Sequence, residues 1–326
     1  MTEPSDLVVV GASAGGVEAL REFAAGLPAD LPAAVLVVLH LPAGGVSALA
    51  SILSRSGPLP AVPAVHDTPL EAGRIHTAVP DRHLLVADSR VVLSRGPTEN
   101  GHRPAIDALF RTAAVNWGAR TVGVVLSGTL DDGAAGLVAI KSRGGVAVVQ
   151  DPAEALYRGM PDSALAMVTP DHVLRARDMG AVLLKILQER VVPEAAPSRM
   201  DTVEARIEAG AMADYGDIVA VTEPSGLSCP DCQGVLFTVE ADRRFRCRVG
   251  HAWTAMALLA QQDLELEKAL WTALRALEEK RQLADRMSTD AMARGQELVA
   301  RRYAEHMHEV DGAAVVLRRL LLDGSA

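Results

Sequence analysis

A glycine-rich segment near the start of the chain holds the first candidate for chemistry. The sequence GASAGG occupies residues 11–16, directly after the apolar run LVVV at 7–10. Ser13 is the centre of a G-x-S-x-G pattern, in which a sharp strand-to-helix turn can expose the hydroxyl as a nucleophile. The same turn could instead bind a phosphate through its backbone N–H groups, or be purely structural. Its spacing differs from the G-x-G-x-x-G of dinucleotide-binding proteins, which disfavours that class.

A serine nucleophile needs a base and a carboxylate that orients the base. His40 ends the apolar run AVLVVL, and Asp131 and Asp132 follow the run VGVVL. The carboxyl ends of parallel strands meet at one edge of a sheet, so these side chains are expected near Ser13. A strand-end histidine and an Asp-Gly turn also occur for structural reasons alone. Four further histidines lie in loops or short strand-like segments and are weaker candidates for the base: His66, His76, His83 and His102.

The three cysteines of the chain lie close together in its C-terminal third. Cys229 and Cys232 form a C-x₂-C pair, and after fourteen residues Cys247 and His251 form C-x₃-H. Two such pairs separated by a hairpin-length segment are typical of a tetrahedral zinc site. Four protein ligands leave no open position, so the sequence predicts a structural Zn²⁺ rather than a catalytic one. Reduced thiols or a redox pair are the alternative.

The elements that must position Ser13, His40 and Asp132 follow an alternating pattern over residues 6–190. Short β-branched runs at 7–10, 34–39, 122–126 and 146–150 alternate with stretches of helical periodicity at 16–26, 45–54, 104–117 and 133–143. This alternation predicts an α/β fold with a doubly wound, mostly parallel sheet. The segment 60–95 contains several shorter strand-like pieces and predicts a small antiparallel excursion, with turns at Ala72-Gly73 and Pro80-Asp81. The chain order serine, histidine, aspartate differs from that of α/β-hydrolases and disfavours that fold.

Changes in composition divide the chain into four segments. We expect a catalytic domain, a linker with a short helix around 203–210, a zinc knuckle and a helical hairpin, over residues 1–190, 191–226, 227–252 and 253–326 respectively. The knuckle should contain two strands, VLFTVE and RRFRCR, joined by a turn at Ala241-Asp242. The hairpin should break near Ser288 to Asp290, where polar residues interrupt the leucine pattern.

The charge balance argues against nucleic acid as the main ligand. The chain has 32 basic and 41 acidic residues, a formal charge of −9, whereas phosphate binding needs clustered lysine and arginine. A local group keeps a zinc-dependent nucleic-acid-binding regulator open as an alternative: Arg243, Arg244, Arg246 and Arg248. No apolar stretch reaches the roughly 18 residues of a membrane span, and no secretory signal is visible. We therefore expect a cytoplasmic protein without membrane insertion.

Five motifs in order give the N-terminal segment a family resemblance. They are GASAGG at 11–16, HLP at 40–42, GHRPAIDALF at 101–110, LSGTLDDGAAGL at 126–137 and GMPDSAL at 159–165. Residues 6–190 resemble the catalytic domain of the chemotaxis protein-glutamate methylesterase (CheB) family. The resemblance implies a serine hydrolase that demethylates glutamyl methyl esters on chemoreceptors, and can deamidate receptor glutamines, without a catalytic cofactor. It implies Ser13 as nucleophile, His40 as base and Asp132 as the orienting carboxylate.

Two positions beside the implied oxyanion depart from the family's pattern. Ala14 stands where a hydroxyl residue is common, and Thr129, followed by Leu130, stands where methionine is frequent. Both raise the question of altered turnover or substrate. The backbone N–H groups of residues 14–16 are candidate oxyanion donors, and Arg103 could hold an acidic substrate or serve packing.

The resemblance also bears on partners and regulation. It implies a methylated chemoreceptor or a related signalling protein as substrate. The family's usual phosphoacceptor receiver domain has no counterpart before the first strand at residue 7. A separate phosphoacceptor protein is therefore a candidate regulator. The main alternative to the enzyme is a signalling scaffold whose hydrolase-like domain binds a methylated or acidic partner without turnover.

Overall fold

The computed structural model describes residues 4–45, 47–189, 196–210, 222–240 and 243–323. The chain divides into two compact units, Met1–Leu258 and Leu259–Ala326. No helix within the described ranges combines the length and apolarity needed to cross a bilayer.

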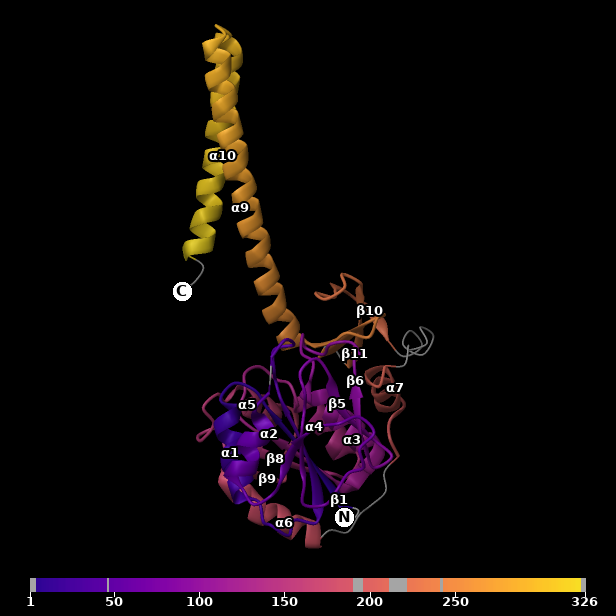
Figure 1. Cartoon of the computed structure of the whole chain (residues 1–326). Coiled ribbons are helices and arrows are strands. Elements are labelled where there is room, and N and C mark those ends of the chain that lie inside the picture. The colour runs from indigo at the N-terminus through magenta and orange to yellow at the C-terminus, as the bar shows by residue number, and fades with distance from the viewer. Residues whose placement is uncertain (1–3, 46, 190–195, 211–221, 241–242, 324–326) are drawn as a thin grey trace. The chain divides into compact units, whose positions relative to one another are not determined.

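A seven-stranded parallel sheet forms the centre of the first unit (Figure 1), in the order β3-β4-β2-β1-β7-β8-β9. Its strands are β1 (Asp6–Ala12), β2 (Ala33–Leu39), β3 (Ala61–Pro63), β4 (Ile75–Thr77), β7 (Thr121–Val125), β8 (Val146–Gln150) and β9 (His172–Leu174). The apolar runs that predict strands in the sequence form the four longest of these. They are buried on both faces, as the continuous hydrophobic pattern requires.

Helices cover both faces of this sheet. Val8 and Val10 of β1 pack with helices α1 (Gly16–Gly26), α2 (Leu49–Ser56) and α6 (Met179–Glu189). Leu7 and Val9 point the other way, because side chains alternate along a strand. They pack with α3 (Ile106–Trp117), α4 (Ala134–Ser142) and α5 (Gly159–Met167). Two short 3₁₀ helices, Gly118–Arg120 and Ala176–Asp178, complete the domain. The predicted α/β fold with a mostly parallel sheet is confirmed.

The antiparallel excursion is smaller than the sequence predicts. Strands β3 and β4 lie in the main sheet and pair in parallel. Strands β5 (His83–Ala87) and β6 (Arg90–Ser94) pair antiparallel, through a turn at Asp88 and Ser89 in which both residues have positive φ. An antiparallel bridge also joins Pro69 to Arg90. The prediction was wrong for β3 and β4, because strands of three residues show no periodicity from which a pairing direction can be inferred.

The C-terminal part of the first unit is larger than the predicted zinc knuckle and begins before it. Helix α7 (Arg199–Glu208) lies in the predicted linker, close to the short helix expected around 203–210, whereas strand β10 (Glu223–Ser228) begins before the predicted start of the knuckle. Strand β10 pairs with β11 (Val235–Glu240), which is followed by β12 (Arg244–Cys247) and β13 (Ala252–Thr254) in one antiparallel sheet. We call this four-stranded sheet the ribbon. The predicted turn at Ala241-Asp242 lies outside the described residues.

Two long helices form the second unit, with α9 (Ala255–Ala293) beginning at the end of the first. Helix α10 (Glu297–Asp323) packs along α9 through an apolar seam at heptad-like spacing, formed by Leu270, Leu274, Leu277, Ala314, Leu317 and Leu321. The predicted break near Ser288 was misplaced. The Thr289 hydroxyl bonds the Asp285 carbonyl within the helix, and the chain turns at Gly295, whose φ is +73°.

Candidate functional site

The candidate catalytic residues lie where the direction of chain crossover changes. Strand β1 leads into α1 on one face of the sheet, and its neighbour β7 leads into α4 on the other. Ligand sites of doubly wound sheets occur at such a switch point, outside the carboxyl ends of the strands. Ser13 follows β1, His40 follows β2 and Asp132 lies in the loop after β7.

Glycines form the turn that presents Ser13. Gly15 has a φ of +68°, a conformation that side chains with a Cβ rarely adopt. At Gly11, an added Cβ would lie 2.2 Å from Ile106 Cγ2, so α3 approaches the strand at this point. The N–H of Ser13 donates to the Ser127 carbonyl at 2.9 Å, which ties the turn to the end of β7. The G-x-S-x-G pattern thus has a local physical cause.

The structure brings the three predicted catalytic side chains together. Ser13 Oγ lies 3.0 Å from His40 Nδ1, and His40 Nε2 lies 2.7 Å from Asp132 Oδ2. Asp132 is an acceptor when ionised, so it favours the tautomer with the proton on Nε2. Nδ1 is then free to accept the Ser13 hydroxyl proton. This is the hydrogen-bond order of a serine nucleophile, its base and an orienting carboxylate.

Asp132 is held ionised at the N-terminus of α3. The backbone N–H groups of Ile106 and Asp107 donate to its two carboxylate oxygens at 2.8 and 3.0 Å. Burial alone would raise its pKa, but the His40 hydrogen bond, the His40 charge and the Ile106 N–H hold the pKa of Asp132 well below its usual range. A carboxylate that stays charged in a buried position can stabilise an imidazolium.

Neighbouring carboxyls have different environments. Asp131 Oδ1 accepts a hydrogen bond from the Thr254 hydroxyl at 2.8 Å, and partial burial raises the pKa of Asp131 to about 6. Asp107 donates its backbone N–H to Asp132, and its own carboxyl is completely buried. This burial and the Asp132 charge raise the pKa of Asp107 well above the usual value. Its Oδ1 accepts the N–H groups of Gly133 and Gly136. Of these three carboxyls, only Asp132 contacts His40, as the family resemblance implies.

A cleft of about 420 Å³ opens beside His40 and is lined in part by Thr98, Gly101 and His102. The ring of His102 stacks on that of His40, with centroids 3.8 Å apart and planes inclined by 13°. His102 is only a weak candidate from sequence, because a contact across 62 positions leaves no local pattern.

Arg103 borders the same cleft and is already paired. Its guanidinium donates to Asp81 Oδ1, at 3.0 Å from Nε, and to the carbonyl of Gly96. Of its two predicted roles, the structure therefore shows structural contacts, which fix the loop on which His102 lies.

The positions that depart from the family's pattern both flank the Ser13 turn. The Ala14 carbonyl accepts the Ser127 hydroxyl at 2.8 Å. Thr129 is exposed, and Leu130 adopts a φ of +59°, a left-handed conformation uncommon for a residue of this type. Neither substitution disturbs the three hydrogen-bonded side chains.

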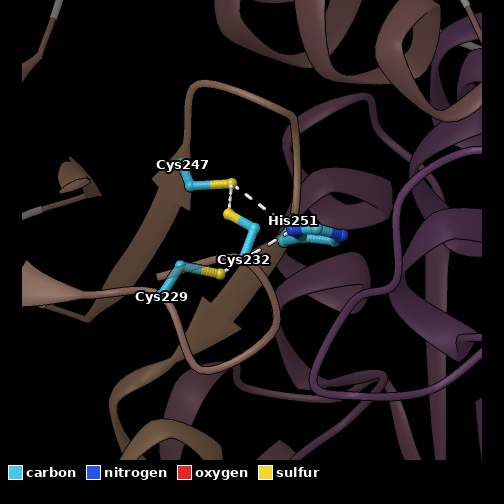
Figure 2. A group of neighbouring side chains, drawn as sticks. All are labelled: Cys229, Cys232, Cys247 and His251. Carbon is cyan, nitrogen blue, oxygen red and sulfur yellow. Dashed lines mark hydrogen bonds between the residues drawn. The ribbon is translucent and has the colours of Figure 1, made fainter. Parts of the chain in front are cut away.

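The four predicted metal ligands converge at one end of the ribbon (Figure 2). Their ligand atoms all lie within 4.8 Å of one another. The sulfurs of Cys232 and Cys247 are 3.6 Å apart, and His251 Nδ1 lies 3.5 Å from Cys247 Sγ and 3.7 Å from Cys229 Sγ. A tetrahedral zinc with ordinary bond lengths has edges of about 3.8 Å between sulfurs and about 3.6 Å between sulfur and nitrogen. The donor types and spacing therefore fit this ion.

A buried ion cluster joins the ribbon to α3 and α7. Arg111 of α3 pairs with Glu99 and Glu208. Arg244 and Arg246 of β12 both pair with Glu204 of α7, at 2.8 and 2.9 Å. These six side chains are buried. Two of the four arginines that suggested a nucleic-acid surface are thus neutralised inside the protein.

Comparison with known proteins gives the family that the sequence motifs resemble. The family model for CheB methylesterase matches residues 8–183. A protein-glutamate methylesterase/protein-glutamine glutaminase of Ralstonia nicotianae is 37% identical over 182 residues, which cover 55% of this chain and 48% of that protein. One from Burkholderia pseudomallei is 40% identical over 178 residues, covering 53% and 49%. This chain thus spans about half the length of the curated relatives it matches.

A solved structure is similar as well. The catalytic domain of the Thermotoga maritima CheB methylesterase superposes with a TM-score of 0.54 at 28% identity, covering 57% of this chain and all of that one. Since the family model covers more than half of its residues, this chain belongs to the CheB methylesterase family.

Proposed function

We propose that this protein is a serine esterase that hydrolyses glutamyl methyl esters of a chemoreceptor or related signalling protein. One observation carries the proposal: Ser13, His40 and Asp132 form a continuous hydrogen-bonded series at the switch point of the sheet. Relatives of the N-terminal half are named protein-glutamate methylesterase/protein-glutamine glutaminase, which supports this substrate class.

In the proposed reaction, Ser13 Oγ attacks the ester carbonyl while His40 Nδ1 accepts the hydroxyl proton. The imidazolium returns this proton to the departing methoxide oxygen, so methanol leaves and an acyl-enzyme remains. Water then attacks the acyl carbon with His40 again as base, which releases the glutamate and restores Ser13. With a glutamine substrate, ammonia leaves in place of methanol.

Backbone donors complete the proposed machinery. The N–H of Gly16 already donates to the Ser13 carbonyl at 2.8 Å. The N–H groups of Ala14 and Gly15 are therefore the proposed donors to the developing oxyanion. No metal or organic cofactor enters this reaction scheme.

A methylated partner, a separate phosphoacceptor regulator and a cytoplasmic location complete the proposal. The first and the last rest on family membership. The regulator rests on the expectation that the family's activity responds to phosphorylation.

Methanol release from methylated chemoreceptor membranes tests the esterase. Wild type should release methanol, and Ser13→Ala, at matched concentration and circular dichroism, should lower turnover by about 10⁴-fold or more. Ser142→Ala, which removes a hydroxyl that bonds a carbonyl of its own helix, is the control. Equal rates in wild type and Ser13→Ala would rule out Ser13 as the nucleophile. Absence of release by wild type would favour the scaffold alternative.

We also propose that Cys229, Cys232, Cys247 and His251 bind a structural zinc ion. The near-tetrahedral spacing of their ligand atoms supports this. The ribbon's apolar core is small, so metal binding would supply folding free energy that the core lacks. Metal analysis should find about one zinc per chain, lost in Cys229→Ser. A metal-free protein with a fully folded ribbon would exclude the site.

A further inference from the structure

The loop of residues 98–102 lies between the two sites described above. It carries His102, whose ring stacks on the catalytic His40. The other side of the same loop pairs with strand β13, which begins directly after the metal-ligand candidate His251. The loop therefore contacts both the catalytic residues and the ribbon.

Backbone hydrogen bonds extend the ribbon into this loop. The N–H of Asn100 donates to the Ala252 carbonyl at 2.8 Å, and the N–H of Ala252 donates to the Thr98 carbonyl at 3.2 Å. The N–H of Thr254 donates to Asn100 Oδ1 at 2.8 Å. Thus the loop acts as an additional edge segment of the ribbon.

Side chains strengthen this attachment at the start of the loop. Thr98 Oγ1 donates to Asp231 Oδ2 at 2.6 Å, and Asp231 lies between the two cysteines of the C-x₂-C pair. Glu99 is buried in ion pairs with Arg111 of the α/β domain and Arg244 of the ribbon. The position of the loop therefore depends on the position of the ribbon.

A second connection reaches the neighbour of the catalytic aspartate. The Thr254 hydroxyl donates to Asp131 Oδ1 at 2.8 Å and also accepts the N–H of Ala257 at 3.1 Å. Asp131 directly precedes Asp132, which bonds His40. Strand β13 thus connects to His40 by two routes, through loop 98–102 to His102 and through Asp131 to Asp132.

We propose that the ribbon, folded around its metal, is a positioning element of the esterase site, and that His102 and Thr254 are positioning residues. This inference rests on the proposed esterase and zinc site. Cys247 N–H donates to the His251 carbonyl at 2.9 Å, so the ligand segment forms the turn that leads into β13. Metal loss should release β13, then loop 98–102, and with it the stacking of His102 on His40.

The ring of His102 is suited to this role because it adds no charge. Burial, and then the neighbouring His40, lower the pKa of His102 to about 4. A neutral ring can restrict the orientation of His40 without opposing the imidazolium that forms during catalysis. Loss of such orientation reduces turnover because the reacting groups are less often aligned.

Hydrogen exchange on the full-length protein tests the connection without relying on activity. We would compare the loaded protein with one stripped by a chelator, with metal content checked in both. The amide of Asn100 should exchange faster after stripping, while amides of β1 and β7 should stay protected. Unchanged exchange of the 98–102 amides in protein shown to be metal-free would overturn the inference.

Kinetics with a small chromogenic ester such as p-nitrophenyl acetate provide the second readout. Thr254→Val, which keeps the metal ligands, should lower kcat by about 10-fold with little change in KM, and Thr254→Ser should restore it. Thr272→Val is the matched control, since the exposed Thr272 hydroxyl bonds the Lys268 carbonyl of its own helix. A Thr254→Val enzyme with wild-type kcat would count against the connection through Asp131.

The two proposals can fail separately. If wild type hydrolyses neither p-nitrophenyl acetate nor receptor methyl esters, the esterase is refuted, and the exchange of loop 98–102 still decides whether the ribbon positions it. If the purified protein holds no metal, the zinc site and this inference are both refuted, whereas the methanol assay still tests the esterase.

Discussion

Two adjacent aspartates show how environment divides the roles of identical side chains. Asp132 accepts two backbone N–H groups and contacts His40, so its pKa is lowered. Asp131 is partly buried and receives one hydroxyl hydrogen bond, so its pKa rises to about 6. The ionised Asp132 carboxylate can stabilise positive charge on His40, whereas ionisation of Asp131 destabilises the folded protein.

The raised pKa of Asp131 predicts a pH-dependent stability. Because the folded state binds this proton more tightly than the unfolded state, its stabilising contribution is lost as pH rises from about 4 to about 6. Asp131→Asn keeps an oxygen acceptor for Thr254 and cannot ionise. The variant's free energy of unfolding minus that of wild type should therefore be about 2 kcal/mol larger at pH 7 than at pH 4, so the variant gains relative stability as pH rises.

Urea unfolding of both proteins at the two pH values measures this difference. Asp88→Asn, at the exposed β5–β6 turn, is the control for removal of a carboxyl. A stability difference between Asp131→Asn and wild type that is the same at pH 4 and pH 7 would contradict the raised pKa.

At the scale of single residues, the sequence predicted the site residues that lie in recognisable motifs. It did not predict contacts between residues that are far apart in the chain. The residues Ser13, His40 and Asp132 follow from strand ends and family motifs, and the structure brings them together. His102 lies within the motif GHRPAIDALF, but neither this motif nor the sequence around Thr254 indicates which residues they contact. Their partners are distant in sequence and depend on how the loops and the ribbon fold.

At the scale of elements, helix α7 and strand β12 are joined by charge rather than by apolar area. In the described part of the chain, a small apolar cluster of Ile207 and Val203 of α7 with Phe237 of the neighbouring β11 accompanies these ion pairs. The cluster holds three arginines and three glutamates, all buried: Arg111, Arg244, Arg246, Glu99, Glu204 and Glu208. Burial raises the pKa of Glu208 to about 8, whereas the surrounding arginines hold the pKa of Glu204, despite its burial, well below its usual range. Removal of one arginine therefore leaves acidic groups in the interior without their cation.

Arg111→Met should therefore destabilise the first unit strongly. The substitution leaves Glu99 and Glu208 without their closest cation, and loss of one partner from a buried pair costs about 3–5 kcal/mol. Arg158→Met is the matched control, because Arg158 forms an exposed pair with Asp162, and such pairs add little. Urea unfolding measures both variants, and equal shifts in the two would show that the buried cluster adds nothing specific.

The elements that sequence predicted well are those with strong periodicity. Long apolar runs identified β1, β2, β7 and β8. Helical spacing identified α1 with its observed ends, and α3 and α4 with small errors at theirs. The three-residue strands β3 and β4 and the pairing of loop 98–102 with β13 depend on tertiary contacts. The position of the helix break was predicted wrongly because polar residues were taken as its signal. Hydroxyl groups can bond carbonyls within a helix, as Thr289 does.

At the scale of the whole molecule, the described apolar clusters are each confined to one unit. The two large clusters around the parallel sheet and the cluster around Cys229 and Trp253 belong to Met1–Leu258. The seam of Leu274, Ala314 and Leu321 belongs to Leu259–Ala326. Separate cores imply that each unit can unfold without exposing the core of the other.

Thermal unfolding should accordingly show two transitions that respond to different substitutions. Leu274 is buried in the α9–α10 seam, so Leu274→Ala should cost the hairpin about 2–3 kcal/mol and lower only its transition. Leu266→Ala, at a position 60% exposed on the same helix, is the control and should change little. Far-UV circular dichroism reports the helices, and the temperature at which the proposed hydrolysis of p-nitrophenyl acetate is lost reports the first unit. If Leu274→Ala lowered both temperatures equally, the two units would unfold as one cooperative structure, and the division of the cores would not govern stability.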